Sequence, residues 1–229
     1  MHLSPSFRYD QPEVLVREVA ARLRARHARS LLDIGAGSGG VAVPLSKEVA
    51  RYLAIEARAP AAAALRAAGL EVVEARFPVD LDERFDVVLS SHSIPEDGPE
   101  LYGPFLGRAW DLVAPGGLLL VITFKGVDDS AVQLLAERLA GRSYGSHPHY
   151  PLLISILNTC GPVERTRIDS HVRTAEASDL VAFFGHWFSD AREGDLEHIL
   201  AETFRDGAGY CVPTPHLVLA VSKPTAPAA

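Results

Sequence analysis

A glycine-rich corner follows a short apolar run near the start of the chain. Residues 31–40 read LLDIGAGSGG, so the acid Asp33 precedes a run that contains Gly35, Gly37 and Gly39. Glycine accepts positive φ and lets a ligand approach the backbone, and N–H groups at the start of a helix attract electron-rich atoms. Because one glycine suffices for a tight turn, we interpret the corner as a ligand-binding loop.

A second acid lies at the end of the next apolar run. Residues 51–55 read RYLAI, which predicts a strand, and Glu56 follows directly. In open α/β sheets, ligands bind beyond the carboxyl ends of the strands, where an acid can accept hydrogen bonds from both hydroxyls of a ribose. Glu56 therefore indicates a nucleoside-binding site.

The corner by itself is compatible with two classes of ligand. Gly35, Gly37 and Gly40 satisfy the dinucleotide fingerprint, which leaves a nicotinamide-dependent oxidoreductase as one alternative. Asp33 favours a different ligand, because a carboxylate beside the pocket suits ammonium and sulfonium charges better than a pyrophosphate. Glu56 fits either class.

The elements that would position these residues alternate between strands and helices. Strands are predicted at 30–34, 51–55, 71–75, 85–90 and 118–123. Helices are predicted at 11–27, from 39 to about 49, at 59–68, 98–113 and 128–140, with a turn at 114–117. This alternation indicates parallel βαβ units, and strands that are apolar almost throughout fit a sheet covered on both faces.

The pattern loosens after residue 141. Residues 141–151 are polar, aromatic and rich in turn formers, which favours a lid or a wall for the substrate. A sixth strand is predicted within 163–174, helices near 176–187 and 194–206, and a last strand at 217–222. We expect a single domain over 1–229, with an N-terminal arm and helix at 1–28 and a substrate-side cap at 141–215.

Composition narrows the class of partner. The chain has 29 acidic and 22 basic residues and a net charge of −7, which argues against a nucleic-acid partner. Its two cysteines, Cys160 and Cys211, fit neither a disulfide framework nor a zinc spacing. No signal peptide or membrane span is recognisable, so we expect a cytoplasmic protein without a membrane partner.

Three motifs together resemble the class I S-adenosylmethionine-dependent methyltransferases. The corner at Asp33 is similar to the first motif of that superfamily, FDVVLSS at 85–91 to its fourth-strand motif, and LVAPGGLLLVI at 112–122 to its L-x-P-G-G motif. The resemblance covers roughly residues 28–125. It implies a Rossmann-like, doubly wound α/β sheet of about seven strands, mostly parallel with an antiparallel last strand, and helices on both faces.

The resemblance also implies S-adenosylmethionine as the cofactor and assigns residues to it. Glu56 would hold the ribose and Ala57 would lie against the adenine. The acid that many relatives place at the adenine edge is replaced here, so backbone groups of Arg76 or Phe77 and the Phe77 ring would serve instead. The full set of expected cofactor-binding residues is Asp33, Gly35, Ala36, Gly37, Gly39, Glu56, Ala57, Arg76, Phe77, Ser90 and Ser91.

His92 is the candidate catalytic residue. It follows the predicted strand where the methyl group should project, and an imidazole with a pKa near 6.5 can take a proton from a hydroxyl acceptor. The alternative is that His92 only packs or hydrogen-bonds its own loop. The expected substrate-binding residues are Tyr9, His92, Tyr144, His147, His149 and Tyr150. The acid cluster of metal-dependent relatives is absent, so no metal is expected.

We therefore expect a metal-independent methyltransferase. It would move a methyl group to an oxygen or nitrogen of a small molecule by in-line displacement, in which the protein mainly aligns the reacting atoms. A methyltransferase acting on protein or RNA, the nicotinamide oxidoreductase and a non-catalytic relative that only binds the cofactor are the alternatives. The acceptor atom stays open, as does the choice between a monomer and a homodimer.

Overall fold

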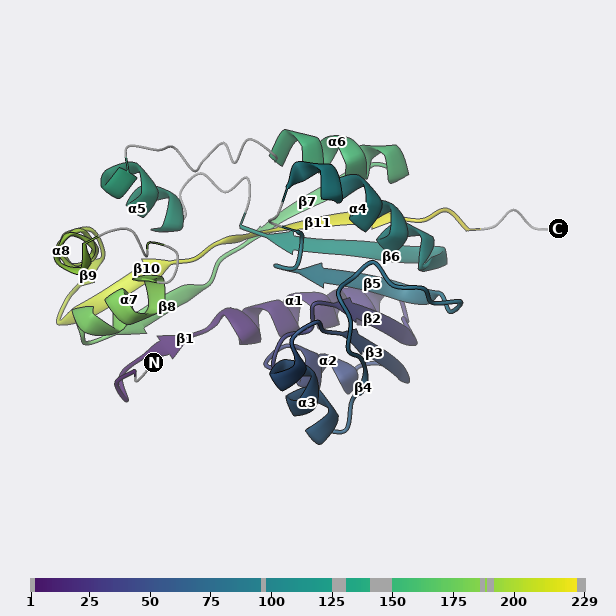
Figure 1. The fold of residues 1–229 in the computed structure, drawn as a ribbon, viewed down its shortest axis with the longest axis horizontal. Helices are drawn as coiled ribbons and strands as arrows, with labels where there is room; N and C mark the ends of the chain where they lie inside the picture. Colours follow the sequence, from purple (N-terminus) through teal and green to yellow (C-terminus); the bar gives the residue numbers. More distant parts are fainter. Residues whose placement is uncertain are drawn as a thin grey trace. The chain divides into compact units, whose positions relative to one another are not determined.

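The chain is divided into two compact units. The computed structural model describes residues 3–95, 98–124, 131–140, 150–185, 188 and 192–225. The larger unit contains residues 15–123, 148–166 and 218–229, and the smaller one residues 1–14, 124–147 and 167–217. Figure 1 shows the course of the chain through both. The expected single domain with a cap at 141–215 stays a prediction.

A seven-stranded sheet is the framework of the larger unit. Its order is β4-β3-β2-β5-β6-β11-β7 (Figure 1). The strands are β2 (Ser30–Ile34), β3 (Arg51–Ile55), β4 (Glu71–Val73), β5 (Phe85–Ser91), β6 (Val113–Thr123), β7 (Val163–Ile168) and β11 (His216–Ser222). The pairings from β4 through β6 are parallel, and the last strands are antiparallel. The predicted Rossmann-like sheet is confirmed.

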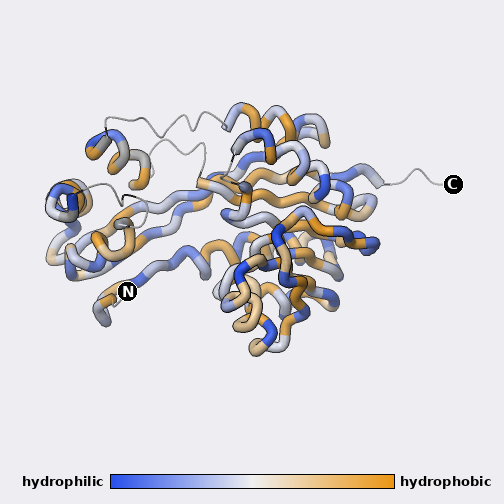
Figure 2. The backbone as a smooth tube through the Cα atoms, viewed as in Figure 1, coloured by the Kyte–Doolittle hydropathy of each residue, from blue (hydrophilic) through white to orange (hydrophobic). Residues whose placement is uncertain are grey.

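Helices cover this sheet, and its central strands are apolar throughout. The helices are α1 (Gln11–Ala25), α2 (Ala42–Ser46), α3 (Ala59–Ala67), the 3₁₀ turn η1 (Pro99–Leu101), α4 (Tyr102–Asp111) and α6 (Tyr150–Cys160). Adjacent residues in β2, Leu31 and Leu32, point to opposite faces and are both fully buried. Figure 2 shows hydrophobic residues along the central strands, and α4 packs against α6. Burial on both faces therefore produces the continuous apolar runs in the sequence.

The smaller unit contains an antiparallel sheet that the sequence did not predict. Its order is β1-β8-β10-β9, and its strands are β1 (Arg8–Tyr9), β8 (His171–Thr174), β9 (Arg205–Asp206) and β10 (Gly209–Pro213). Its helices are α5 (Ala131–Ala140), α7 (Ala177–Phe184) and α8 (Glu193–Thr203). Leu180, Phe184 and Val212 are fully buried in its core. Two of the strands have only two residues, which is too short for a periodic pattern.

The N-terminal arm belongs to the smaller unit and is fixed to α7. The Phe7 and Tyr9 rings lie 5.5 and 4.8 Å from the Phe183 ring. The buried Asp179 carboxylate accepts hydrogen bonds from the Ser4 backbone N–H at 2.9 Å and from Ser4 Oγ at 2.6 Å. The arm is thus anchored by aromatic packing and by a polar contact with a charged acceptor.

Several predicted boundaries differ from the structure for local reasons. The helix predicted from 39 to about 49 is the short α2, which contains Pro44. The turn predicted at 114–117 is part of β6, because the chain after β11 pairs with it: Lys223 N donates to Gly117 O at 2.9 Å. The single strand predicted within 163–174 is two strands, β7 and β8. Helix α6 starts at Tyr150, within the segment 141–151 that the sequence predicts to be a lid or a wall for the substrate.

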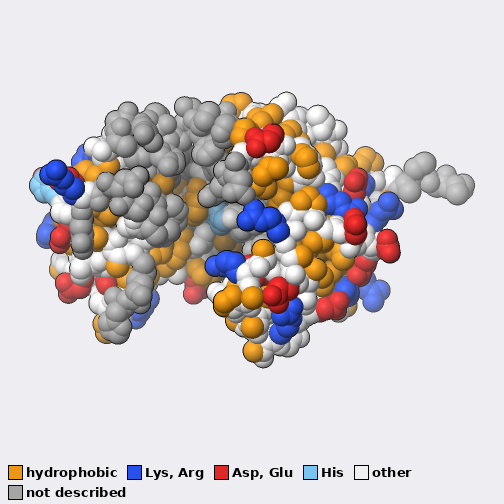
Figure 3. All heavy atoms as spheres, in the orientation of Figure 1, with side chains coloured by type: hydrophobic (Ala, Val, Ile, Leu, Met, Phe, Trp, Pro, Cys, Tyr) orange, Lys and Arg blue, Asp and Glu red, His pale blue; other side chains and the backbone are white. Residues whose placement is uncertain are grey.

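The surface carries charges of both signs. On the face in Figure 3, Lys and Arg side chains are interspersed with Asp and Glu over the larger unit. None of the helices among the described residues is both long and apolar enough to cross a membrane.

Candidate functional site

The glycine corner after β2 has a backbone that favours glycine. Gly35, Gly37 and Gly39 have φ values of +75°, +64° and +107°, a region that other residues rarely adopt. The N–H groups of Gly35 and Ala36 donate to Ile55 O at 2.8 and 3.2 Å, which ties the corner to the end of β3. The corner and the carboxyl end of β3 therefore form one edge of the sheet.

Gly35 is also restricted by packing. A Cβ atom at this position would lie 2.4 Å from the Cβ of Ser93, which is in the loop after β5. A Cβ at Gly37, by contrast, would meet nothing within 4 Å. Gly35 thus permits close packing within the protein, whereas Gly37 leaves open space beside the loop.

Glu56 is a buried acceptor at the end of β3. It is 5% exposed, its Oε2 accepts from Gly37 N–H at 2.8 Å, and its Oε1 accepts from the backbone N–H of Arg58 at 2.9 Å and from Arg58 Nε at 3.1 Å. Burial by itself would raise the pKa of Glu56, but these hydrogen bonds outweigh it and lower the pKa. Glu56 is therefore ionised at neutral pH.

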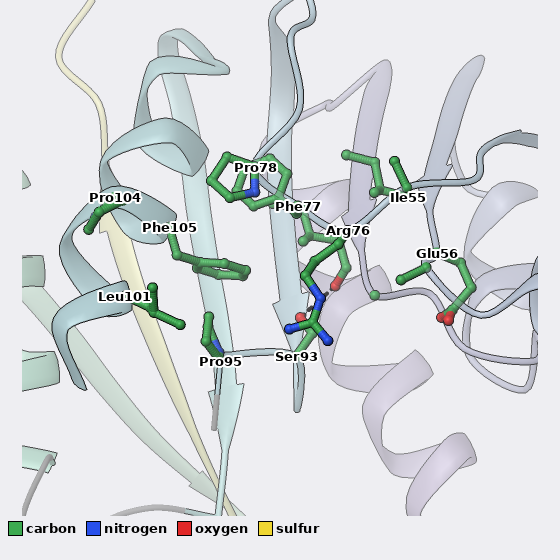
Figure 4. Close-up of a pocket in the computed structure, with 14 residues that line it drawn as sticks. Ile55, Glu56, Arg76, Phe77, Pro78, Ser93, Pro95, Leu101, Pro104 and Phe105 are labelled. Atoms are coloured by element: carbon green, nitrogen blue, oxygen red, sulfur yellow. Dashed lines mark hydrogen bonds between the residues drawn. The ribbon is translucent and has the colours of Figure 1, made fainter. Parts of the chain in front are cut away.

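A pocket of about 450 Å³ lies beside Glu56 (Figure 4). Gly35, Glu56 and Ala57 line it from the corner and β3, and residues 75–78 line it from the loop after β4. Its far wall comes from the loop after β5 and from the start of α4. The volume is within the range of small-molecule sites.

The far wall is apolar and aromatic. The Phe77 and Phe105 rings are 5.0 Å apart in an edge-to-face arrangement, and both side chains are buried. Pro95, Leu101 and Pro104 complete this wall, as Figure 4 shows. The pocket therefore combines a carboxylate on one side with an apolar, aromatic wall on the other, which is an arrangement that suits a nucleoside.

Ala75 and Arg76, the two residues that can replace the acid of many relatives, both line the pocket. Figure 4 shows the Arg76 side chain extending along the pocket. A guanidinium has hydrogen-bond donors and no acceptor. The Arg76 side chain therefore cannot accept a hydrogen bond from the amino group of an adenine, as an acid would.

Asp33 is buried beneath the corner and does not line this pocket. It is 3% exposed, and its Oδ2 accepts from the Tyr52 hydroxyl at 2.5 Å. Burial raises the pKa of Asp33 to about 6, against the opposing effect of the Tyr52 hydrogen bond, and the nearby Glu56 charge raises it further. The predicted contact of Asp33 with the cofactor stays a prediction.

The residues after β5 have distinct positions. Ser90 is buried, and its Oγ lies 2.9 Å from Ser93 Oγ, which donates to Ile34 O at 2.6 Å. His92 is exposed, has a φ of +53°, and its backbone N–H donates to Ile122 O at 2.9 Å. His92 does not line the pocket described above, and its catalytic role stays a prediction.

The pocket brings together part of the predicted cofactor set. The residues that line it are Gly35, Glu56, Ala57, Arg76 and Phe77; those that do not are Asp33, Ala36, Gly37, Gly39, Ser90 and Ser91. Of the predicted substrate residues, Tyr9 lies in the smaller unit, and Tyr150 begins α6 in the larger unit. Tyr144, His147 and His149 lie outside the described residues.

Sequence reasoning missed the part of the far wall that comes from the segment after β5. Ser93, Pro95, Leu101, Pro104 and Phe105 all follow β5 within a short stretch. The available signal was their position, because loops after parallel strands lie at the same edge of the sheet. Within the part of the chain that the structure describes, no group of three or more His, Cys, Asp or Glu side chains could hold a metal ion.

The comparisons with known proteins agree with this geometry. A sequence model of a methyltransferase domain matches residues 7–156. No curated protein sequence matches the chain.

Solved structures share the fold at low sequence identity. A Bacillus halodurans protein whose assignment as a methyltransferase is itself provisional has a TM-score of 0.59 and 17% identity, with 91% of this chain and 100% of that one covered. The N-methyltransferase NodS from Bradyrhizobium japonicum has a TM-score of 0.52 and 13% identity, with 94% and 99% covered. DesVI from Streptomyces venezuelae has a TM-score of 0.46 and 17% identity; the match covers 72% of this chain and spans only 63% of DesVI. The first two of these likenesses establish the fold.

Proposed function

The chain belongs to the methyltransferase domain family and uses S-adenosylmethionine, and from this premise we propose that it methylates an oxygen or nitrogen of a small molecule. The observation that supports the binding of this cofactor most directly is the pocket beside Glu56. In that pocket a buried, ionised carboxylate faces a wall formed by Phe77 and Phe105. The family match also favours methyl transfer over the nicotinamide-dependent alternative.

The residues of the pocket fit the adenosine part of the cofactor. Glu56 would accept hydrogen bonds from the ribose hydroxyls, because an ionised carboxylate is a strong acceptor. Ala57 and Phe77 would lie against the flat base. Gly37 leaves open space beside the corner, where the rest of the cofactor would pass the backbone.

We propose that the chain promotes the reaction mainly by alignment. When bound, S-adenosylmethionine supplies a methyl group on a positively charged sulfur, which is already electrophilic. The protein residues would then hold the acceptor in line with that group. Such positioning can lower the activation free energy of a reaction by up to roughly 7–11 kcal/mol. The proposal includes no metal.

Surface charge supports a small acceptor. The net charge is −7, and the face of the larger unit in Figure 3 mixes acidic and basic side chains. The net negative charge would repel a phosphate backbone, whereas a small acceptor does not require an extended basic surface.

Turnover with a panel of small amines and hydroxyl compounds tests this function. The purified chain should bind S-adenosylmethionine and release S-adenosylhomocysteine with at least one acceptor, and EDTA should leave the rate unchanged. Glu56→Ala should weaken cofactor binding about 10- to 100-fold, since hydrogen bonds to a charged group contribute about 1.5–3 kcal/mol. Calorimetry that finds no binding of S-adenosylmethionine would contradict the proposal.

His92 is the proposed base when the acceptor is a hydroxyl. His92→Gln should then lower kcat about 10²- to 10⁴-fold and remove the acidic limb of the pH–rate profile. Cofactor affinity should not change, because His92 does not line the pocket beside Glu56. An unchanged kcat and pH profile with a hydroxyl acceptor would restrict His92 to a role in its own loop.

A further inference from the structure

The Glu56 carboxylate is nearly saturated with hydrogen bonds from the protein itself. Its Oε1 accepts from both the backbone N–H and Nε of Arg58, at 2.9 and 3.1 Å, and its Oε2 accepts from Gly37 N–H at 2.8 Å. A carboxylate offers about four acceptor sites, two on each oxygen. Oε1 therefore has no site left. A ribose that donates one hydroxyl to each oxygen needs one of these donors to leave.

The three donors differ in how readily they can leave. The N–H groups of Gly37 and Arg58 belong to the backbone of the corner and of the start of α3, so the fold holds them in place. The Arg58 side chain is 71% exposed, whereas the Glu56 side chain is only 6% exposed. An exposed guanidinium is rehydrated easily, and a pair that includes one contributes little to stability. The Arg58 guanidinium is therefore the exchangeable donor.

We propose that the Arg58 guanidinium holds the place of the ribose. It pairs with Glu56 when no ligand is bound and moves into solvent when the ribose hydroxyls bind the same carboxylate. The inference rests on the proposed function, in which Glu56 binds the ribose. The buried Glu56 charge needs hydrogen-bond partners both with and without the ribose. The Arg58 guanidinium is the partner that it has only without the ribose. Arg58 is thus a positioning residue that lowers the affinity for adenosine ligands.

Calorimetry with 5′-methylthioadenosine tests the exchange, because this ligand is uncharged and keeps both ribose hydroxyls. Arg58→Ala should bind it about two- to fivefold more tightly than the unaltered chain, since the ligand no longer competes with an exposed ion pair. Raising the salt concentration from about 0.05 to about 0.5 M should narrow this difference, because salt weakens the pair in the unaltered chain. Arg58→Met, which keeps an unbranched stem and lacks the donor, should behave as Arg58→Ala does.

Two controls separate the exchange from a general effect of charge. The ligand 2′,3′-dideoxyadenosine lacks both hydroxyls, so Arg58→Ala should leave its affinity unchanged. Arg66→Ala removes another exposed cation of α3, which pairs with Glu74 at 2.6 Å, and should change neither affinity.

Two kinds of result would overturn the proposed role of Arg58 and leave the proposed function standing. One is equal or weaker binding of 5′-methylthioadenosine by both Arg58 variants, while the unaltered chain still binds it. The other is an equal gain with the dideoxy ligand. If the unaltered chain binds neither 5′-methylthioadenosine nor S-adenosylmethionine, the proposed function fails together with the inference.

Discussion

Gly35 shows how one residue of the corner is required by its own backbone and by a distant loop. Its φ of +75° lies in the left-handed region, and the Ser93 Cβ would be 2.4 Å from any Cβ placed there. The first constraint is local and is visible in the glycine pattern. The second depends on β2 and β5 being neighbours in the sheet, which only the fold reveals.

Gly35→Ala should therefore lower the free energy of unfolding, and a second substitution at Ser93 should restore part of the loss. We expect a loss of at least about 1–2 kcal/mol of unfolding free energy from the left-handed conformation alone, together with weaker binding of S-adenosylhomocysteine. The double variant Gly35→Ala/Ser93→Gly should recover the part that is due to overlap. Gly103→Ala is the matched control, because a Cβ there meets nothing within 4 Å and lies in helix α4. It should be neutral or stabilise by up to about 1 kcal/mol in urea unfolding.

Asp33 should make the stability of the fold depend on pH. Its pKa is about 6 in the folded protein, against an ordinary value of 3.8, because burial disfavours the charged carboxylate. Between these two values the folded state binds more protons than the unfolded state, so the unfolding free energy falls as the pH rises from about 4 to about 6. Integrated over this range, the loss is about 2–3 kcal/mol.

Asp33→Asn should remove this loss, because an amide carbonyl can still accept from Tyr52 and carries no charge. Urea unfolding at pH 4.5 and at pH 7.5 would measure it: the variant should gain stability relative to the unaltered chain at the higher pH. The exposed Asp80→Asn is the control and should leave the pH dependence unchanged. A pH dependence that persists in Asp33→Asn would assign it to another group.

At the scale of elements, short strands and local anchors shape the smaller unit. Strand β1 has two residues and pairs with β8, as Arg8 lies opposite Arg173 and Tyr9 opposite Val172. So short a strand adds few hydrogen bonds. The arm is also held by Asp179, by the packing of Phe7 and Tyr9 against Phe183, and by Ser6 Oγ, which accepts from the Ala175 N–H at 3.1 Å.

Asp179→Ala should release the arm. Removing this acceptor leaves the Ser4 N–H and hydroxyl without their charged partner, at a cost of about 1–3 kcal/mol. Limited trypsin digestion followed by mass spectrometry should show faster cleavage after the exposed Arg8. Glu176→Ala, an exposed acid in the preceding turn, should leave the rate unchanged. Equal cleavage rates for both variants would show that the remaining contacts, among them the aromatic packing and the Ser6–Ala175 hydrogen bond, hold the arm without Asp179.

At the scale of the molecule, the described pocket lies wholly within the larger unit. A ligand that binds the folded state stabilises it by mass action, by about 2.7 kcal/mol at a concentration of 100 times Kd. S-adenosylhomocysteine should therefore raise the unfolding free energy, and Glu56→Ala, which we expect to weaken binding about 10- to 100-fold, should abolish about half of the gain or more at the same ligand concentration.

Hydrogen exchange should locate that stabilisation. Protection should increase in the corner, after β3, at residues 75–78 and at the start of α4, which are the segments that line the pocket. Residues 205–213 of β9 and β10 should serve as an internal reference with little change. Protection confined to residues 205–213 would place the ligand elsewhere.

The sequence by itself determined the sheet of the larger unit and predicted the edge where we propose that its ligand binds. Strands buried on both faces leave continuous apolar runs, and both the glycine corner and Glu56 directly follow such runs, so local pattern was sufficient. Only the tertiary structure decided what completes the pocket, since Ser93 packs against Gly35 and Phe105 against Phe77, both from the segment after the neighbouring β5. It also decided the antiparallel sheet, whose short strands depend on partners far along the chain. Contacts between segments distant in sequence leave no local pattern in the sequence. For this physical reason the sequence predicted the strands and the corner, whereas only the tertiary structure revealed the partners that they meet.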